Sequence, residues 1–523
     1  MKNYKSITFL ILVFILILSG CNSSNSTDAD PTSSGQKGDT MKLAWTSQPP
    51  TLDPQVTPTN VVRDLARPIF ETLVTFDENY QVTAMLAKDY EVSEDGKVIT
   101  FHLRENVKFH NGKEMKAEDV VASMEKWQTS SSIAKAELGK STWEAKDDYT
   151  VLLNVETPSL SIMFTLADVS QAAAIMPKEV VDGADEKGVK EYIGTGPFMV
   201  EEWKFDQYIH YTKFQDYLAS EAPTSGLSGK KEARVENLYV HFVPDDSTRT
   251  NGIVSGEYDY AYQLSFDSYD QLKNTSGIKN IITPFGIQGL VFNKKVGIFS
   301  DVRARQAVNL ALDNEELLSV AFANEEFYDL EPAFMRPEQI DWYTDAGKEN
   351  YNVQDLDEAK RLLDEAGYKG EEITILTSSD YSHHYNSAIV TQAALQEIGM
   401  NVKLDTTDWA TLLEKRGKPE EFNIFFTSFT TVPTPLQYTF LNSENKYPGW
   451  TNNPEIDQLL KDIKNAETQD IATQKFGELQ ELVWTDLPII NVGITNIINS
   501  HKEKVEGYSD FLGPVFWNMS ISK

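Results

Sequence analysis

Cysteine is almost absent from this sequence, because Cys21 is the only one in 523 residues. A chain with one cysteine can form no disulfide within itself and no zinc site built from several thiolates. That cysteine lies close to the N-terminus, ahead of the segments that show strand and helix patterns. Thiol catalysis in the main body of the chain is therefore excluded as well.

Positive charge is also scarce. The sequence has 47 lysine and arginine residues against 79 acidic residues, which gives a formal net charge of −32. Nucleic acid is a poor partner for such a chain, because phosphate binding needs a basic face. The acidity is typical of a surface that resists non-specific association.

Long hydrophobic runs are missing, apart from one at the start. The segment Ile7–Leu18 is almost entirely apolar, but it is shorter than the roughly 20 residues that span a bilayer. Two lysines precede it and Ser19-Gly20-Cys21 follows it, an arrangement similar to the lipobox of bacterial lipoproteins. We therefore expect residues 1–20 to be a signal peptide and Cys21 to carry lipid. Residues 21–40 are rich in small polar side chains and should form a flexible linker.

Motifs of the common enzyme classes are missing too. There is no G-x-S-x-G and no H-E-x-x-H, and the nearest approach to a phosphate-binding loop, Gly139-Lys140-Ser141, has Ala134 where the first glycine is required. His102 and His110 have no acidic partner at metal-ligand spacing. We therefore predict no catalytic residues, no metal site and no cofactor. These absences argue against a secreted hydrolase, the alternative from another functional class.

The two halves of the chain are patterned differently. In the first half, hairpin-like alternation dominates, as in the strand 98–103, where Ile99, Phe101 and Leu103 face one way. In the second half, capped helical patterns alternate with short apolar strands at 373–376, 402–404 and 422–429. Helices between short strands indicate the α/β class, with parallel strands.

The stretch Gly289–Asp313 lies between these halves. A short apolar run is followed by a polar turn and then by a helix that Ser300 can cap. Arg303 and Arg305 lie off the apolar face of this helix, which consists of Ala304, Ala307, Val308, Ala311 and Leu312. We interpret the stretch as the place where the chain crosses from one lobe into another, and the β-branched segment 489–498 as its return.

Five blocks of sequence then stand out. They are ITFHLRENVKFHNGKEMKAEDVVASMEKW (99–127), YIGTGPF (192–198), GLVFN to FSDVRARQAVNLALD (289–313), DEAKRLLDEAGY (357–368) and ALQEIGMNVKLDTTDW (394–409). In this order they resemble the extracellular solute-binding proteins of family 5, the substrate-binding lipoproteins of oligopeptide, dipeptide and nickel-type ABC importers. The resemblance runs from about Leu43 to about Phe516, and the first and third blocks are specific.

The resemblance implies a two-lobed α/β fold of the periplasmic-binding-protein type, which closes on its ligand around crossing segments near Gly289 and Gly493. It also implies the boundaries of the parts: a first lobe at 41–288 with a small extra domain inserted at about 72–178, a second lobe at 289–497, and a return to the first lobe at 498–523. The implied function is not enzymatic. A monomer, anchored by lipid to the outer face of the cytoplasmic membrane, would capture a small solute, a peptide by default. It would deliver that solute to the permease and ATPase subunits of an importer.

The resemblance nominates ligand-binding residues in the second lobe: His383, His384, Trp409, Arg416, Ser428, Phe429, Thr430 and Thr431. Arg416 matches an arginine that reaches a ligand carboxylate in some relatives, and Trp409 matches an aromatic wall. His383 or His384 matches a histidine of the cleft. Each has an ordinary alternative: a solvated charge run for Arg416, a polar loop ahead of a helix for the histidines, and a core position for Trp409.

Thr431 departs from the family pattern. Many peptide-binding relatives have an aspartate at this position that pairs with the ligand's α-ammonium group, and a hydroxyl brings no charge. A nickel–metallophore, a glutathione-like compound or a sugar therefore stays open as the solute, and a sensor role on the same fold stays open as well. If the solute is a peptide, we expect its carboxylate or another anionic group to matter more than its free amino terminus.

Overall fold

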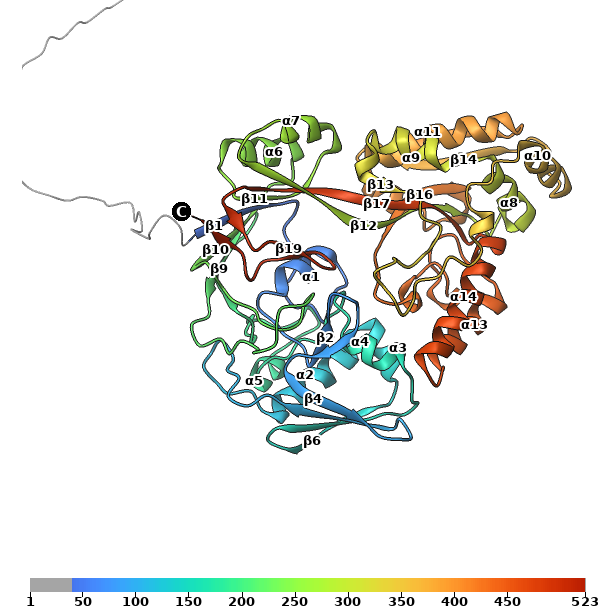
Figure 1. The fold of residues 1–523 in the computed structure, drawn as a ribbon. Coiled ribbons are helices and arrows are strands. Elements are labelled where there is room, and N and C mark those ends of the chain that lie inside the picture. Colours follow the sequence, from blue (N-terminus) through green and yellow to red (C-terminus); the bar gives the residue numbers. More distant parts are fainter. Residues whose placement is uncertain (1–39, 523) are drawn as a thin grey trace, which may run out of the picture. The chain divides into compact units, whose positions relative to one another are not determined.

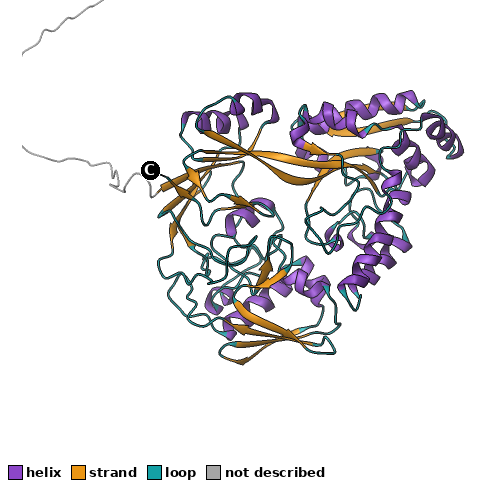
Figure 2. Ribbon diagram, viewed as in Figure 1, coloured by secondary structure: helices purple, strands orange, loops and turns teal. Residues whose placement is uncertain are grey.

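The strand order defines the architecture of residues 40–522, the part of the chain that the computed structural model describes. One mixed sheet runs in the order β15-β14-β16-β12-β17-β11-β1-β10-β9-β8 (Figures 1 and 2). Its strands are β1 (Thr40–Trp45), β8 (Phe198–Lys204), β9 (Tyr208–Lys213), β10 (Asn237–Phe242), β11 (Tyr260–Leu264), β12 (Ile278–Phe292), β13 (Tyr328–Asp329, paired with β17), β14 (Glu372–Ser378), β15 (Asn401–Thr407), β16 (Ile424–Thr430) and β17 (Ile489–Lys502). The predicted α/β class with parallel strands is confirmed, since β14 pairs in parallel with both β15 and β16. Cys21, and with it the expected signal peptide and linker, lies outside the described residues.

Two long antiparallel strands join the two ends of this sheet. β12 and β17 pair from Ile278↔Lys502 to Val291↔Ile489, and we call this pair the ribbon. Next to β17 lies β11, which leads into β1 and β8–β10, and we call this side the first lobe. Next to β12 lies β16, which leads into β14 and β15, and we call this side the second lobe. Gln288 and Gly493, beside the predicted crossing points, are Cα partners on the ribbon.

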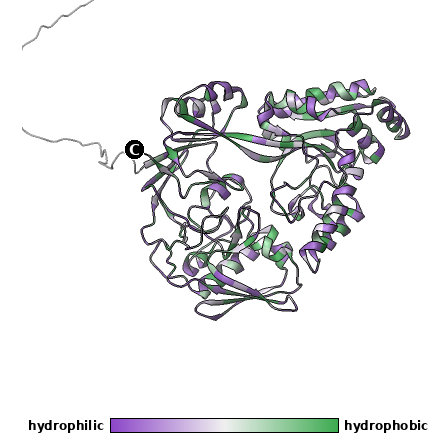
Figure 3. Ribbon diagram, viewed as in Figure 1, coloured by the Kyte–Doolittle hydropathy of each residue, from purple (hydrophilic) through white to green (hydrophobic). Residues whose placement is uncertain are grey.

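Both lobes contain helices, some of which flank the sheet (Figure 2). In the first lobe they are α1 (Asn60–Ala66), α5 (Lys178–Asp182), α6 (Asp246–Ser255) and α7 (Tyr269–Lys273). In the second lobe they are α8 (Val302–Ala311), α9 (Asn314–Phe322), α10 (Leu356–Glu365), α11 (Ser382–Glu397), α12 (Trp409–Lys415), α13 (Pro454–Lys464) and α14 (Gln469–Asp486). Asp355 caps α10 as predicted, because its carboxylate accepts the N–H of Glu358 (3.0 Å). Hydrophobic residues are concentrated along the central strands (Figure 3). None of the helices described here is long and apolar enough to cross a membrane.

The helix that follows the crossing differs from the prediction at two positions. All the residues of its predicted apolar face are buried. Its cap, however, is Asp301, which accepts the N–H of Arg303 (2.9 Å), because Ile298–Ser300 forms a separate 3-10 turn ahead of the helix. Arg305 is off the apolar face but not on the surface. It is buried, and it donates hydrogen bonds to the carbonyl oxygens of Asp486 (2.6 Å) and Phe299 (2.8 Å).

A smaller antiparallel sheet with its own core is inserted into the first lobe. Its strands, in the order β4-β5-β7-β6, are β4 (Ala87–Val92), β5 (Val98–Leu103), β6 (Thr142–Asp147) and β7 (Thr150–Asn154). The hairpin β2 (Val74–Phe76) and β3 (Val82–Ala84) and the helices α2 (Ala117–Ser130), α3 (Ser132–Leu138) and α4 (Ser161–Leu166) accompany it. The buried residues of this core lie between Leu73 and Ile175. Near the C-terminus, β18 (Val505–Glu506) pairs with β21 (Ser520–Ile521), and β19 (Ser509–Asp510) pairs with β20 (Pro514–Val515).

Candidate ligand-binding site

The loops that follow β14, β15 and β16 lie at one edge of the second lobe's sheet, because the carboxyl ends of parallel strands meet at the same edge. Ser379, just after β14, donates its N–H to the carbonyl of Thr407 at the end of β15 (3.0 Å). The N–H of Trp409 is bound in turn by the carboxylate of Asp380 (2.8 Å). This edge therefore brings the predicted residues His384, Trp409 and Ser428 close together.

A hydrogen-bonded chain joins Ser428 to His384. The hydroxyl of Ser428 donates to Oε1 of Gln288 (3.0 Å), and Nε2 of Gln288 donates to Nδ1 of His384 and to Oγ of Ser387 (3.2 Å each). His384 must be neutral at Nδ1 to accept this bond, and burial does hold its pKa well below the usual value. His384 therefore supports Gln288, which lies on the ribbon, and offers no positive charge to a ligand.

His383 and Trp409 are held by aromatic contacts. The ring of His383 stacks on Phe322 with 5.3 Å between centroids, and burial lowers its pKa to about 4. The indole of Trp409 stacks on His384 at 5.7 Å and meets Tyr381 edge-on at 5.0 Å. The histidines are not in a loop ahead of the helix, because α11 begins at Ser382. Tyr381 precedes that helix without making a side-chain capping bond, so no capping residue marks its start.

Arg416 and Phe429 lie on the opposite face of β16. The guanidinium of Arg416 is placed over the rings of Phe425 (5.7 Å) and Tyr447 (5.6 Å), and its Nη1 donates to the hydroxyl of Tyr447 (3.4 Å). Phe429 packs against Tyr447 (5.7 Å between centroids) and Phe440 (4.7 Å). This group is separated by the strand itself from the chain that joins Ser428 to His384.

Thr430 and Thr431 line a cavity between the lobes. Its volume is about 210 Å³, which is less than a typical site for a drug-sized ligand but enough for several water molecules or part of a larger solute. Thr431 faces it with little free bonding capacity, since its N–H (2.9 Å) and hydroxyl (3.5 Å) both donate to the carbonyl of Phe285. The remaining wall is formed by residues of both lobes and of the ribbon: Asn60, Arg63, Glu78, Tyr80, Tyr262, Pro284, Phe285, Arg336, Glu338, Ile497 and residues 510–514.

The segment 510–514 is fixed to α1 by arginines. Arg67 donates to the carbonyl oxygens of Phe511 (3.2 Å), Leu512 (2.9 Å) and Gly513 (3.3 Å). Beside it, Nε of Arg63 pairs with Oδ1 of the fully buried Asp64 (2.7 Å). Burial lowers the pKa of Arg67 to about 10, so it remains charged and can hold these carbonyl groups at neutral pH. The first-lobe wall of the cavity is thus a C-terminal segment bound to an N-terminal helix.

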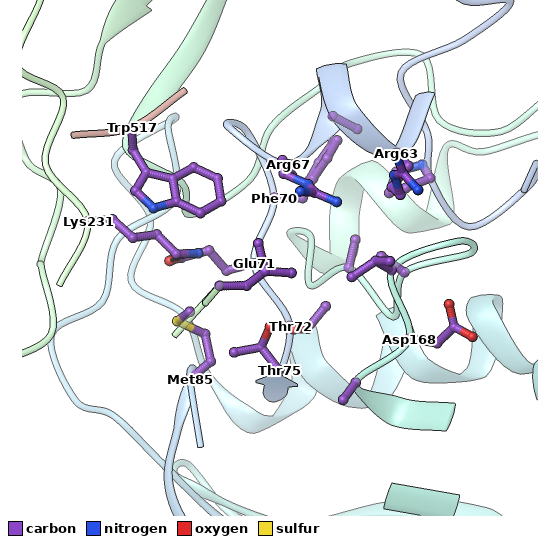
Figure 4. A pocket seen from close by; sticks show the side chains of 17 residues that line it. Arg63, Arg67, Phe70, Glu71, Thr72, Thr75, Met85, Asp168, Lys231 and Trp517 are labelled. Carbon is purple, nitrogen blue, oxygen red and sulfur yellow. Dashed lines mark ion pairs between the residues drawn. The ribbon is translucent and has the colours of Figure 1, made fainter. Parts of the chain in front are cut away.

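A smaller cavity of about 50 Å³ lies behind this wall, between the inserted sheet and the first lobe (Figure 4). The charged group at its centre, the carboxylate of Glu71, is bound by other side chains of the protein. Glu71 pairs with Lys231 (3.2 Å) and accepts hydrogen bonds from Thr195 (3.0 Å) and Tyr217 (2.9 Å). We assign this network to holding the inserted sheet on the first lobe, because its carboxylate already pairs with a cation and accepts hydrogen bonds from two hydroxyl groups of the protein.

Comparison with known proteins agrees with this architecture. The profile of the bacterial extracellular solute-binding proteins, family 5 (middle region), matches residues 81–450, which is more than half of the chain. The chain belongs to this family.

This family 5 protein is similar to proteins whose names or structures mention different solutes. It is 26% identical over 492 residues (89% of this chain, 91% of the relative) to the probable peptide ABC transporter periplasmic-binding protein y4tO of Sinorhizobium fredii. The structure of AgaA of A. tumefaciens R10 with agropinic acid superposes with a TM-score of 0.76 at 24% identity, over 92% of this chain and 99% of that one. The structure of NikZ of Campylobacter jejuni with Ni(L-His) gives 0.77 at 18% identity, over 92% and 99%. These two structures share the fold with this chain.

Family membership settles the broad role. The protein is an extracytoplasmic solute-binding protein of an ABC importer, and it is not an enzyme. The two-lobed fold of the periplasmic-binding-protein type, with an extra antiparallel sheet, is confirmed. Within residues 40–522, no group of three or more His, Cys, Asp or Glu side chains is arranged to hold a metal ion.

The family 5 pattern did not point to most of the charged residues of the interlobe cavity. Arg63 lies on α1, a short helix without a binding motif, and Asp510 lies in the short strand β19, which carries no motif either. Arg336 and Glu338 lie in a segment without helix or strand. The sequence of α1 does contain one signal. Asp64 lies between Arg63 and Arg67, and an acid on the buried face of a helix is unusual unless it pairs with such charges.

Proposed function

We propose that the solute is a peptide, which this protein captures between its lobes and presents to the permease and ATPase subunits of its importer. The observation that carries the proposal is the half-open edge of β16 beside the cavity. All of β16 pairs with β12, but only Ile424 and Phe425 pair with β14. No other described strand pairs with Phe426–Thr430 on that side. An extended peptide can satisfy such an edge with its own backbone hydrogen bonds.

The charges of the cavity also suit a peptide, which carries both signs at its ends. Arg63 and Arg336 supply guanidinium groups, and Glu78, Glu338 and Asp510 supply carboxylates. A neutral sugar can form hydrogen bonds with such side chains, but it cannot compensate their charges. A nickel–metallophore, a glutathione-like compound or a sensor role remain the alternatives, since relatives of this fold bind solutes of more than one class.

Mass spectrometry of the solute released from the purified protein tests the proposal. We expect short peptides, and we expect tetrapeptide pools to raise the melting temperature of the protein after its own solute has been removed. Release of an opine, a sugar or a nickel complex, with no response to peptides, would show that the peptide assignment is wrong while solute capture stands.

Four related proposals concern the anchor, the oligomeric state, the domain boundaries and the residues that contact the ligand. Cys21 is the lipidated residue that anchors the chain to the outer face of the cytoplasmic membrane, and residues 21–40 are its tether. The protein acts as a monomer. The lobes and the inserted domain follow the boundaries given above, with the inserted core between Leu73 and Ile175 in support. The residues we propose to contact the ligand are Thr430 and Thr431, with Ser428 and Trp409 at the same edge. His383, His384, Arg416 and Phe429 shape the surrounding structure.

A further inference from the structure

The interlobe cavity contains a carboxylate that forms no ion pair with any residue in the part of the chain that the structure describes. Asp510 lines the cavity and is partly buried, and its Oδ2 accepts one hydrogen bond, from the hydroxyl of Tyr508 (3.1 Å). No ion pair formed within residues 40–522 includes it. The neighbouring arginines are already occupied, since Arg63 pairs with Asp64 and Arg67 holds the carbonyl groups of residues 511–513.

A second carboxylate next to it adds to the negative charge. Asp64 is fully buried, and its Oδ2 has no hydrogen-bond partner. It lies against the same loop as Asp510, because a Cβ added to Gly513 would be 2.4 Å from Oδ1 of Asp64. Burial, with the charge of Asp64 as the next cause, raises the pKa of Asp510 to about 6, and the hydrogen bond from Tyr508 and the charges of Arg63 and Arg67 offset this only in part. A carboxylate in this position is stabilised when a positive group enters the cavity.

The other acidic residues of the cavity wall are not partly buried carboxylates without an ion pair. Glu338 is exposed and pairs with Arg336 (3.2 Å), and Glu78 is exposed to solvent. Both keep their hydration when the cavity is empty, so a cation gains less from them than from a partly desolvated carboxylate.

We propose that Asp510, supported by Asp64, binds the cationic nitrogen of the solute, and so replaces the acid that Thr431 does not supply. For a peptide, this nitrogen is the α-ammonium group or an amino side chain. The proposal rests on the proposed function, because it assigns a role within the same cavity. It reverses the expectation drawn from Thr431 alone: a free amino group on the solute matters more than its carboxylate.

The test compares the full chain with two variants, Asp510→Asn and the matched control Glu506→Gln, which removes an exposed acid four residues earlier. The probes are three pools of tetrapeptides that lack lysine and arginine: unmodified, N-acetylated and C-amidated. We expect acetylation to weaken binding to the unaltered protein at least tenfold and amidation to weaken it less. Asp510→Asn should lose the same factor for the unmodified pool and nothing further for the acetylated pool, whereas Glu506→Gln should bind all pools as the unaltered protein does.

Equal binding of acetylated and unmodified peptides would overturn the proposal, and so would an Asp510→Asn variant that retains full affinity. If no peptide pool binds but a solute is released from the purified protein, the peptide assignment is wrong. The role of Asp510 is then tested with the released solute. A positively charged solute that Asp510→Asn no longer retains supports the role of Asp510, and a solute without positive charge refutes it. If the protein binds no solute of any kind, both proposals are wrong.

Discussion

Replacing Gly513 by alanine tests how the first-lobe wall of the cavity is built. Gly513 has a φ of +107°, and a Cβ there would be 2.4 Å from Oδ1 of Asp64 and 2.6 Å from Nη2 of Arg63. An L-residue at positive φ costs about 1–2 kcal/mol by itself. To relieve the clash, the loop must also move away from Arg67, and each hydrogen bond from a charged donor that is lost costs about 1.5–3 kcal/mol. We therefore expect Gly513→Ala to lower the free energy of unfolding by about 3 kcal/mol or more.

Gly399→Ala is the matched control for this experiment. Gly399 has a similar φ of +92°, but a Cβ there would have no neighbour within 4 Å. It should therefore show only the backbone strain, about 1–2 kcal/mol, and leave solute affinity unchanged. Urea denaturation measures the free energy of unfolding, and calorimetric titration with a peptide that the protein binds measures the affinity. We expect Gly513→Ala to bind that peptide at least tenfold more weakly than the unaltered protein. If the two variants lose the same stability and neither loses affinity, the loop is not held against α1 as described.

We expect four further outcomes, three from the structure and one, for Cys21, from the sequence. Binding of a free-amine peptide should weaken about tenfold between pH 7 and pH 5 in calorimetric titration, because the pKa of Asp510 is about 6 and the carboxylate is protonated below it; an acetylated peptide should show no such loss. The titratable and charged groups around Asp510 are Asp64, Arg63, Arg67, Tyr80, Tyr260, Tyr262 and Tyr508. In the protein without solute at pH 8, Asp510→Asn should raise the free energy of unfolding by about 1–2 kcal/mol. The reason is that a carboxylate whose pKa is raised by folding destabilises the folded state at any pH where it is ionised. An unchanged or lower free energy of unfolding in urea denaturation would contradict this. Gln437→Leu removes the hydrogen bond that Gln437 donates across the lobes to the buried Asp168. In small-angle scattering without solute, this variant should have a larger radius of gyration than the control variant Gln458→Leu, which loses a hydrogen bond within one helix. Identical scattering curves would contradict the contact between the lobes. Cys21→Ser should release the protein from the membrane fraction, and retention through a lipid elsewhere would disprove the anchor.

Periodicity and caps predicted most of the second lobe. Ala304, Ala307 and Val308 lie on one buried helical face, and the cap at Asp355 forms as expected. The start of α11 was missed because no capping side chain precedes it. Arg305 was expected off the core face, but it is buried because the last carbonyl groups of α14 need a donor there. That need depends on a segment far away in sequence.

The site was harder to predict than the fold, because it is assembled from distant segments. Alignment with relatives points to residues of one strand and the loops beside it, and of these Thr430 and Thr431 line the cavity. The opposite wall joins Arg63 near one end of the chain to Asp510 near the other. Local sequence patterns carry no information about which distant segments form one wall. His383 and His384 match a cleft histidine by position, but burial keeps both neutral.

The ribbon has a consequence for how proteins of this kind can change during evolution. Val291 and Ile489 are Cα partners, so the chain leaves the ribbon for the second lobe and re-enters it at the same point. A segment whose two ends are neighbours can be exchanged for another of different length, provided that the new segment supplies a strand that pairs with β12 as β16 does. Recombination at these two positions would transplant Ser428, Thr430 and Thr431 as one module while Asp510 stays behind. The two halves of the cavity can therefore be inherited separately, and a new pairing of halves is a route to a new solute.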